Sequence, residues 1–188
     1  MNGIVIVDKP AGWTSQDVAA RLRRVFDTRR IGHGGTLDPM ATGVLPVFVG
    51  RATRGVEFFE HAEKTYEAVL RLGLTTDTED VTGEVLEQRD VNISEAEFLG
   101  ILPQFRGEIQ QIPPMYSALK VNGQKLCDLA RKGVEVERKA RTITIFELEC
   151  IEFSGITARL RVRCSKGTYI RTLCKDIGQA LGCGGCME

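Results

Sequence analysis

The chain has 188 residues, 43% of them apolar and 27% charged, and its 25 Lys and Arg residues are balanced by 25 Asp and Glu residues. Domains commonly take about 100–200 residues, so we expect one folded domain with a sizeable core rather than a disordered chain. A net charge of zero argues against a protein that holds nucleic acid by bulk positive charge alone, and no apolar run approaches the roughly 18 residues that a membrane span needs.

The first expected element is a strand within residues 1–9. Its apolar run has no charged leader before it and is followed by Asp8, which is typical of a strand and not of a signal peptide. Thr14 and Asp17 then match the pattern of a capping box, and apolar side chains follow at helical spacing at Val18, Leu22, Val25 and Phe26. These signals predict a helix over residues 15–26.

The glycine-rich stretch from Arg29 to Pro39 lacks the periodicity of a helix or a strand and is predicted to be a loop. No Gly-Lys-Ser/Thr follows it, which excludes a P-loop, and Leu37 occupies the place of the third glycine of a dinucleotide fingerprint. The chain has no Gly-x-Ser-x-Gly, which excludes an esterase of the α/β-hydrolase type. With two His residues in the chain, a zinc triad or a Ser-His-Asp triad is hard to assemble, so His33 alone cannot carry hydrolysis.

The middle of the chain is acidic and the second half is basic. A half-buried strand is predicted from the alternation of Tyr66, Ala68, Leu70, Leu72 and Leu74. Residues 61–100 hold ten acidic and three basic side chains, whereas residues 101–188 hold nine acidic and fourteen basic ones. We interpret the acidic stretch from Asp77 to Asp90 as solvated surface. Ser94 then caps a short helix that Pro103 ends.

Residues 103–140 are predicted to form a mobile, positively charged insertion between core elements, with Lys120, Lys125, Arg131, Lys132, Arg138 and Lys139. Strands are expected at residues 141–151 and 157–164, and the second presents Arg159, Arg161 and Arg163 on one face, either to solvent or to phosphate. A final amphipathic helix repeats Ile170, Leu173, Cys174, Ile177 and Leu181. Strands broken by isolated helices favour an α+β fold with a largely antiparallel sheet.

Six cysteines without a signal peptide indicate a reducing compartment, the cytoplasm, and mostly buried, inert thiols. Cys183 and Cys186 form a CxxC pair, which is found in zinc sites and in redox sites. A zinc site needs a second pair of ligands, and a redox pair usually opens a helix. Because neither context is visible, we expect thiols in a glycine-rich turn and no metal. A zinc or redox protein stays an alternative that metal analysis tests.

Asp38 is the main candidate for chemistry. A loop aspartate before proline is commonly a turn residue or a helix cap, and that interpretation stays open. Arg171, at the start of the last helix, is a candidate to pair with this carboxylate, hold it ionised and lower its pKa. Tyr66 and Tyr169 offer flat faces on which a base can stack, although a strand tyrosine is more commonly part of the core.

Four segments resemble the motifs of the TruB family of tRNA pseudouridine synthases, in the family's order and spacing. Residues 32–46, Gly-His-Gly-Gly-Thr-Leu-Asp-Pro-Met-Ala-Thr-Gly-Val-Leu-Pro, resemble the catalytic motif and place Asp38 at its nucleophile. The first motif, the tyrosine motif and the third motif correspond to residues 9–15, 64–66 and 164–173. Residues 113–120 match as well, where the family has an insertion that grips RNA.

The resemblance implies a pseudouridine-synthase fold with a bent, mixed but largely antiparallel sheet, and an isomerase that uses no cofactor or metal. In the family, the target is the uridine at position 55 in the T-loop of tRNA, which must be flipped out of the folded loop to be reached. The resemblance implies that Asp38 is the nucleophile and that Arg171 keeps it ionised. It further implies that Tyr66 stacks on the base and relays the C5 proton, and that substrate is bound by Tyr66, Tyr169, His33, Lys64 and Leu173.

The resemblance also has departures. Gly34 stands where many members have Thr, and Cys127 replaces an aromatic residue of the insertion. The family continues past the position of Glu188 into a further motif strand and usually a small RNA-binding PUA domain, so we expect a shortened chain that forms one catalytic domain over residues 1–188. A non-catalytic tRNA-binding or RNA-folding module is therefore the alternative function. We expect a monomer of the stand-alone bacterial type, with tRNA as its partner and no membrane.

Overall fold

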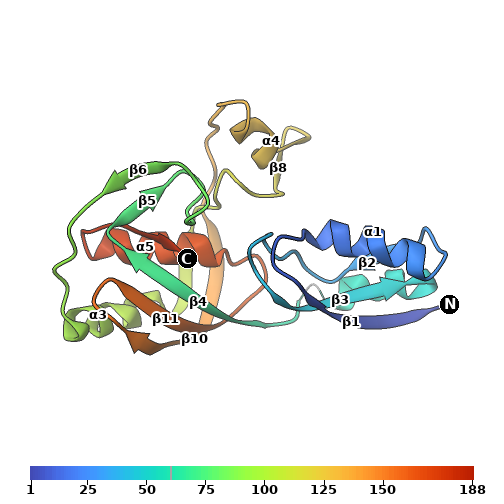
Figure 1. Cartoon of the computed structure of the whole chain (residues 1–188), viewed down its shortest axis with the longest axis horizontal. Helices are drawn as coiled ribbons and strands as arrows, with labels where there is room; N and C mark the ends of the chain where they lie inside the picture. The colour runs from blue at the N-terminus through green and yellow to red at the C-terminus, as the bar shows by residue number, and fades with distance from the viewer. Residues whose placement is uncertain (60) are drawn as a thin grey trace. The chain divides into compact units, whose positions relative to one another are not determined.

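The chain divides into two compact units, Met1–Ala62 and Glu63–Glu188 (Figure 1). The computed structural model describes residues 1–59 and 61–188. Each unit is built around its own antiparallel sheet, and each is described by itself.

The first unit is a three-stranded sheet covered by one helix. Its central strand, β3 (Gly43–Val49), pairs with β1 (Gly3–Lys9) on one side and with β2 (Ile31–His33) on the other. The helix α1 (Ser15–Val25) begins at the Thr14–Asp17 capping box, as predicted, and packs Val18 and Ala19 against the sheet. A 3-10 helix, Gly50–Gly55, and the short α2 (Val56–Phe59) follow β3.

The prediction of a loop from Arg29 to Pro39 is wrong for residues 31–33, because Ile31–His33 forms the strand β2. Ile31 lies opposite Val49 and is buried, and Gly32 and His33 lie opposite Phe48 and Val47. A strand of three residues is too short to show a periodicity of two, and the residues it pairs with, Val47 to Val49 on β3, lie further along the chain. The remainder of the stretch is irregular, as predicted.

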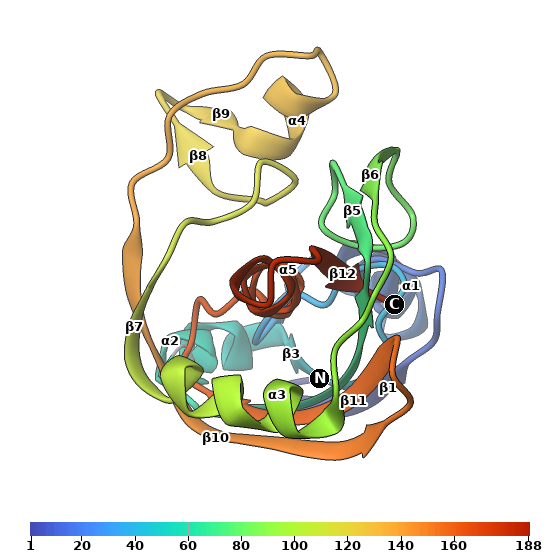
Figure 2. The ribbon, with the colours of Figure 1, turned by 90° about the vertical axis from the view of Figure 1, so that its left-hand side faces the viewer.

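The second unit contains a five-stranded sheet in the order β12-β4-β11-β10-β7. These strands are β12 (Gly185–Met187), β4 (Lys64–Leu72), β11 (Thr157–Cys164), β10 (Arg141–Phe153) and β7 (Gly107–Gln111). Figure 2 shows the sheet curving around the helix α5 (Ile170–Ala180). The hairpin β5 (Leu74–Thr76) and β6 (Val85–Gln88) and the helix α3 (Glu95–Ile101), which a 3-10 helix at Leu102–Phe105 extends, complete the unit.

The predicted alternation of β11 and the predicted apolar stripe of α5 are confirmed. Ala158, Leu160, Val162 and Cys164 are fully buried on one face of β11, and Leu173, Cys174 and Ile177 are fully buried on α5. All strand ladders among the described residues are antiparallel, with one isolated parallel bridge between Asp80 and Met187. The expected α+β class is confirmed. No helix in residues 1–59 or 61–188 is long and apolar enough to cross a membrane.

The segment that leaves the sheet is shorter than the predicted insertion at residues 103–140, because Gly107–Gln111 forms the edge strand β7 and pairs with β10. We call residues 112–140 the insertion. It contains the hairpin β8 (Lys120–Val121) and β9 (Gln124–Lys125) and the helix α4 (Leu126–Ala130). Figures 1 and 2 both show this hairpin and helix standing away from the five-stranded sheet.

Candidate active site

Asp38 lies in the loop between β2 and β3, and the residues on both sides of it are bonded to the segment that follows β1. The Nζ of Lys9 and the backbone N–H of Gly12 donate to the carbonyl oxygen of Pro39, at 3.2 and 2.8 Å. The backbone N–H of Leu37 donates to Oγ of Ser15 at 2.9 Å. Residues 9–15 therefore hold the backbone immediately before and immediately after Asp38.

Lys9 is fully buried at the end of β1. Its ammonium group donates to the carbonyl oxygens of Pro10, Trp13 and Pro39, at 2.9, 2.5 and 3.2 Å. Burial lowers the pKa of Lys9, and the negative charge of Asp38 opposes that decrease. Lys9 thus brings a positive charge near the candidate nucleophile. The sequence motif contained Lys9, but no sequence signal showed that it is buried.

His33, at the end of β2, is oriented by a contact between its Nδ1 and the backbone carbonyl of Gly35. Between them, Gly34 donates its N–H to the carbonyl oxygen of Pro46 at 2.9 Å. A Cβ atom at Gly34 would lie 3.1 Å from the ring of Phe48, which is tighter than ordinary contacts. Glycine therefore fits the close approach of this loop to Phe48.

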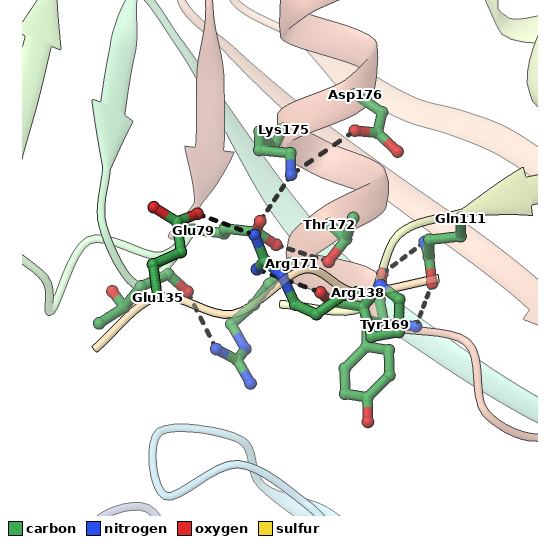
Figure 3. Close-up of polar contacts among 11 residues, drawn as sticks. Glu79, Gln111, Glu135, Arg138, Tyr169, Arg171, Thr172, Lys175 and Asp176 are labelled. Carbon is green, nitrogen blue, oxygen red and sulfur yellow. Dashed lines mark hydrogen bonds and ion pairs between the residues drawn. The ribbon is translucent and has the colours of Figure 1, made fainter. Parts of the chain in front are cut away.

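Arg171 is buried in the first turn of α5, and its guanidinium is surrounded by oxygen atoms of the second unit (Figure 3). Nη1 donates to the carbonyl of Thr78 at 2.9 Å and Nη2 to the carbonyl of Tyr116 at 3.0 Å. Nε lies 3.8 Å from the Oδ2 of Asp80. Arg171 therefore lies next to the carboxylate of Asp80, a neighbour that the sequence did not indicate. The pairing with Asp38 stays a prediction.

The acidic stretch from Asp77 to Asp90 is not uniformly solvated, and the prediction is wrong for Glu79 and Asp80, which are 8% and 6% exposed. The Oδ1 of Asp80 accepts hydrogen bonds from the side chains of Thr78 and Thr82 at 2.9 and 2.5 Å, and from the backbone of Thr82 at 2.9 Å. Buried carboxylates need compensating partners, and besides these threonines they have partners on α5, which are Arg171 for Asp80 and Thr172 and Lys175 for Glu79. A charge pattern in the sequence does not reveal partners some 90 residues away. The strand β6, later in the stretch, is exposed as predicted.

The other candidate residues lie on β4 and around the start of α5. Tyr66 is half-buried opposite Val162, and Lys64, also half-buried, begins the same strand. Tyr169 precedes α5, and its backbone N–H and carbonyl are both bonded to the side-chain amide of Gln111, at 2.9 and 3.1 Å. Leu173 is fully buried on α5 and belongs to the core of this unit.

The arginines of β11 form ion pairs with glutamates of the neighbouring strands and of the segment before β4. Arg159 and Arg161 lie 2.6 and 3.0 Å from the carboxylate of Glu67, and Arg161 also lies 3.3 Å from that of Glu149. Arg163 pairs with Glu63 and Glu147 at 2.6 and 2.8 Å. Their positive charge is balanced within the sheet surface, which favours the solvated face over the phosphate-binding one.

All six cysteines are free thiols. Cys183 lies in the turn after α5, as predicted, whereas Cys186 is buried in β12. Burial raises the pKa of Cys186 to about 11 and also raises that of Cys174. These thiols are therefore protonated at neutral pH and poor nucleophiles. Within residues 1–59 and 61–188, no three His, Cys, Asp or Glu side chains are grouped to hold a metal ion.

Comparison with known proteins assigns the chain to a family. Residues 23–170 match the model of the TruB family pseudouridylate synthase (N terminal domain). The tRNA pseudouridine synthase B of Dechloromonas aromatica is 53% identical over 184 residues, which are 98% of this chain and 62% of that protein. The tRNA pseudouridine synthase B of Alkaliphilus oremlandii is 52% identical over 188 residues, or 63% of its length. The chain thus spans less than two thirds of these relatives.

Solved structures agree with this assignment. A chain in the crystal structure of a Cbf5-Nop10-Gar1 complex superposes with a TM-score of 0.77 and 34% identity, over 99% of this chain and 46% of that one. A chain in the structure of an H/ACA RNP bound to a substrate RNA containing 2'-deoxyuridine gives a TM-score of 0.72 and 31% identity, over 99% of this chain and 45% of that one. The chain belongs to the TruB family of pseudouridylate synthases.

Proposed function

We propose that this chain converts uridine to pseudouridine at position 55 in the T-loop of tRNA, with Asp38 as the nucleophile. The observation that carries the proposal is the fixing of the Asp38 loop by Lys9, Gly12 and Ser15. A nucleophile whose neighbouring backbone is held by hydrogen bonds on both sides loses less conformational freedom when it meets its target, and this lowers the barrier to reaction. Relatives at 52–53% identity are named tRNA pseudouridine synthase B, which supports the substrate class.

In the proposed reaction, the bond between N1 of uracil and C1′ of ribose breaks and a bond between C5 and C1′ forms. The proton on C5 leaves, and N1 gains one, so the reaction needs no external oxidant, reductant or cofactor. Asp38 must be ionised to act as a nucleophile, and we assign Arg171 to keep it ionised. Tyr66 stacks on the flipped base and relays the C5 proton.

We assign the remaining contacts with the substrate to four side chains. Tyr169 and Leu173 shape the pocket from the start of α5, Lys64 binds substrate beside Tyr66, and His33 supports the displaced bases of the T-loop. The basic insertion, residues 112–140, grips the RNA by attraction to its phosphates, which depends on local rather than total charge. In this proposal residues 1–188 form one catalytic domain of a cytoplasmic monomer.

Replacing the nucleophile tests the proposal. Asp38→Asn keeps the size of the side chain and removes its charge, so it is expected to abolish tritium release from C5-labelled uridine in T-loop RNA while RNA binding survives. The matched control is Asp27→Asn, which changes an exposed aspartate of the same unit and is expected to leave release unchanged. Undiminished release by Asp38→Asn would contradict the assignment.

The alternative is a non-catalytic module that binds or folds tRNA. The chain spans 62% of the length of one relative, so this alternative is tested beside the proposal. It predicts that the chain binds tRNA and forms no pseudouridine, even at enzyme excess. Our proposal predicts both binding and product.

A further inference from the structure

Glu79 lies between the two residues of its segment that contact Arg171. On one side of it, the carbonyl of Thr78 accepts from Nη1 of Arg171, and on the other, the carboxylate of Asp80 lies 3.8 Å from Nε. The side chain of Glu79 contacts two other residues of α5 instead. Its carboxylate accepts from the hydroxyl of Thr172 at 2.5 Å and from the Nζ of Lys175 at 2.6 Å (Figure 3). Residues 78–80 thus contact the first two turns of α5 at several points.

The backbone of Glu79 adopts a conformation that side chains rarely accept. Its φ is +65°, in the left-handed region where glycine, asparagine and aspartate are the common residues. The backbone is also held from outside, because its carbonyl accepts from the N–H of Met187 at 3.0 Å. A strained backbone that keeps a long acidic side chain points to a role for the carboxylate itself.

The carboxylate of Glu79 is matched to its partners in charge and in hydrogen bonds. A buried carboxylate is tolerated when a cation and hydrogen-bond donors compensate it, and Lys175 and Thr172 supply these. Lys175 also lies 3.9 Å from Asp176, but the shorter distance of 2.6 Å places its ammonium on Glu79. Removing the charge of Glu79 would free Lys175 to turn toward Asp176.

The start of α5 depends on partners outside the helix. The residue before it, Tyr169, makes no side-chain capping hydrogen bond, and the first turn contains no acidic residue. Negative charge near the start of a helix is favourable, and here Glu79 is such a charge next to Thr172. The rotation of α5 about its axis determines where Arg171 points, so contacts that fix this rotation also fix the guanidinium.

We infer that Glu79 is a positioning residue, which holds α5 through Thr172 and Lys175 so that Arg171 stays between Thr78 and Asp80. This inference rests on the proposed function for its effect on activity. Glu79 touches neither the reacting base nor Asp38 in this role, and it acts only through Arg171. Its loss should therefore lower the rate of the chemical step and leave RNA binding unchanged.

Kinetics on the full 188-residue chain provide the first test. Glu79→Gln is expected to lower kcat about tenfold with KM for T-loop RNA unchanged within about twofold. Lys175→Gln is expected to lower kcat to the same extent. The kcat of the double variant should be no lower than that of either single variant, because both substitutions remove the same interaction between Glu79 and Lys175. The matched control, Glu84→Gln, alters an exposed residue of the same acidic stretch and should retain the kcat of the wild type.

A second measurement keeps the inference independent of the proposed activity. The Nε–H of Arg171, assigned by its disappearance in Arg171→Lys, is followed by NMR in 15N-arginine-labelled protein. Its exchange with solvent should be slow in the wild type and in Glu84→Gln, and at least about tenfold faster in Glu79→Gln. If the wild type makes no pseudouridine, the proposed function fails, and this exchange rate alone then decides the role of Glu79.

Thermal melting and circular dichroism show whether each variant folds. Should Glu79→Gln not fold, Thr172→Val keeps the shape of the side chain, removes only the hydroxyl that donates to Glu79, and should shift kcat and exchange in the same direction. Folded variants with wild-type kcat and wild-type exchange at Arg171 would overturn the inference. So would an increase in KM with kcat preserved.

Discussion

Lys9 stabilises the Asp38 loop by donating to three backbone carbonyls at once. Two of them, on Pro10 and Trp13, belong to the turn after β1, and the third, on Pro39, directly follows Asp38. One buried ammonium therefore joins the turn and the loop. Full burial of a lysine is tolerated here because every contact is to an oxygen atom and Asp38 contributes negative charge.

Lys9→Met tests this role through stability. Methionine has a similar length but cannot donate, so three backbone carbonyls lose a charged partner. We expect the free energy of unfolding to fall by about 2 kcal/mol, as measured by urea denaturation at pH 7. Lys139→Met, at an exposed site of the insertion, should change it by less than about 0.5 kcal/mol. Equal stability of the two variants would contradict the role of Lys9.

The sequence was most informative about the individual helices and strands. The capping boxes at Thr14 and Ser94 start α1 and α3 as predicted, since these hydrogen bonds are local in sequence. The alternation in β11 and the stripe in α5 follow from one buried face, which hydrophobic pattern records directly. The strand β2 was missed because its existence depends on pairing with β3 rather than on its own three residues.

α5 carries a destabilising charge at Asp176, next to the Glu79–Lys175 pair. Burial raises the pKa of Asp176 to about 6 from 3.8, an increase that Lys175 opposes and Glu79 reinforces. Because this pKa is higher in the folded chain, Asp176 keeps its proton between about pH 4 and 6 in the folded chain, whereas the unfolded chain has already lost it. The charged carboxylate therefore costs stability above about pH 6 and costs none below about pH 4.

Asp176→Asn is accordingly expected to stabilise the chain at pH 7.5, by about 1 kcal/mol, since about a third of the side chain is exposed and solvent screens its charge. The gain should shrink as the pH falls and disappear near pH 4. Melting temperatures of wild type and variant across this range measure it. A gain that is constant with pH would show that charge at Asp176 is not its cause.

At the scale of the whole molecule, the distribution of charge matters more than its total of zero. The hairpin and helix of the insertion stand away from the five-stranded sheet (Figures 1 and 2), while the arginines of β11 are paired with glutamates. Part of the acidic stretch lies inside, where Glu79 and Asp80 hold α5 and Arg171. Composition could not show that Glu79 and Asp80 are buried, because their burial depends on contacts with residues of α5 some 90 positions away.

The candidate site was predicted from motifs to the extent that its residues lie in contiguous segments. Asp38, Tyr66 and Arg171 were proposed in this way. Lys9 holds the backbone next to Asp38 and Gln111 holds that of Tyr169, and both act through backbone atoms of distant segments. Such contacts leave no pattern in a single sequence, since any donor of suitable reach satisfies them.

We propose that this 188-residue chain itself carries out the isomerisation. The decisive measurement is single-turnover tritium release from C5-labelled tRNA, with the chain in excess over RNA. We predict release of one tritium per tRNA at position 55, and none from a tRNA with cytidine at that position. Tight binding of tRNA with no tritium released would contradict the claim and favour a module that only binds.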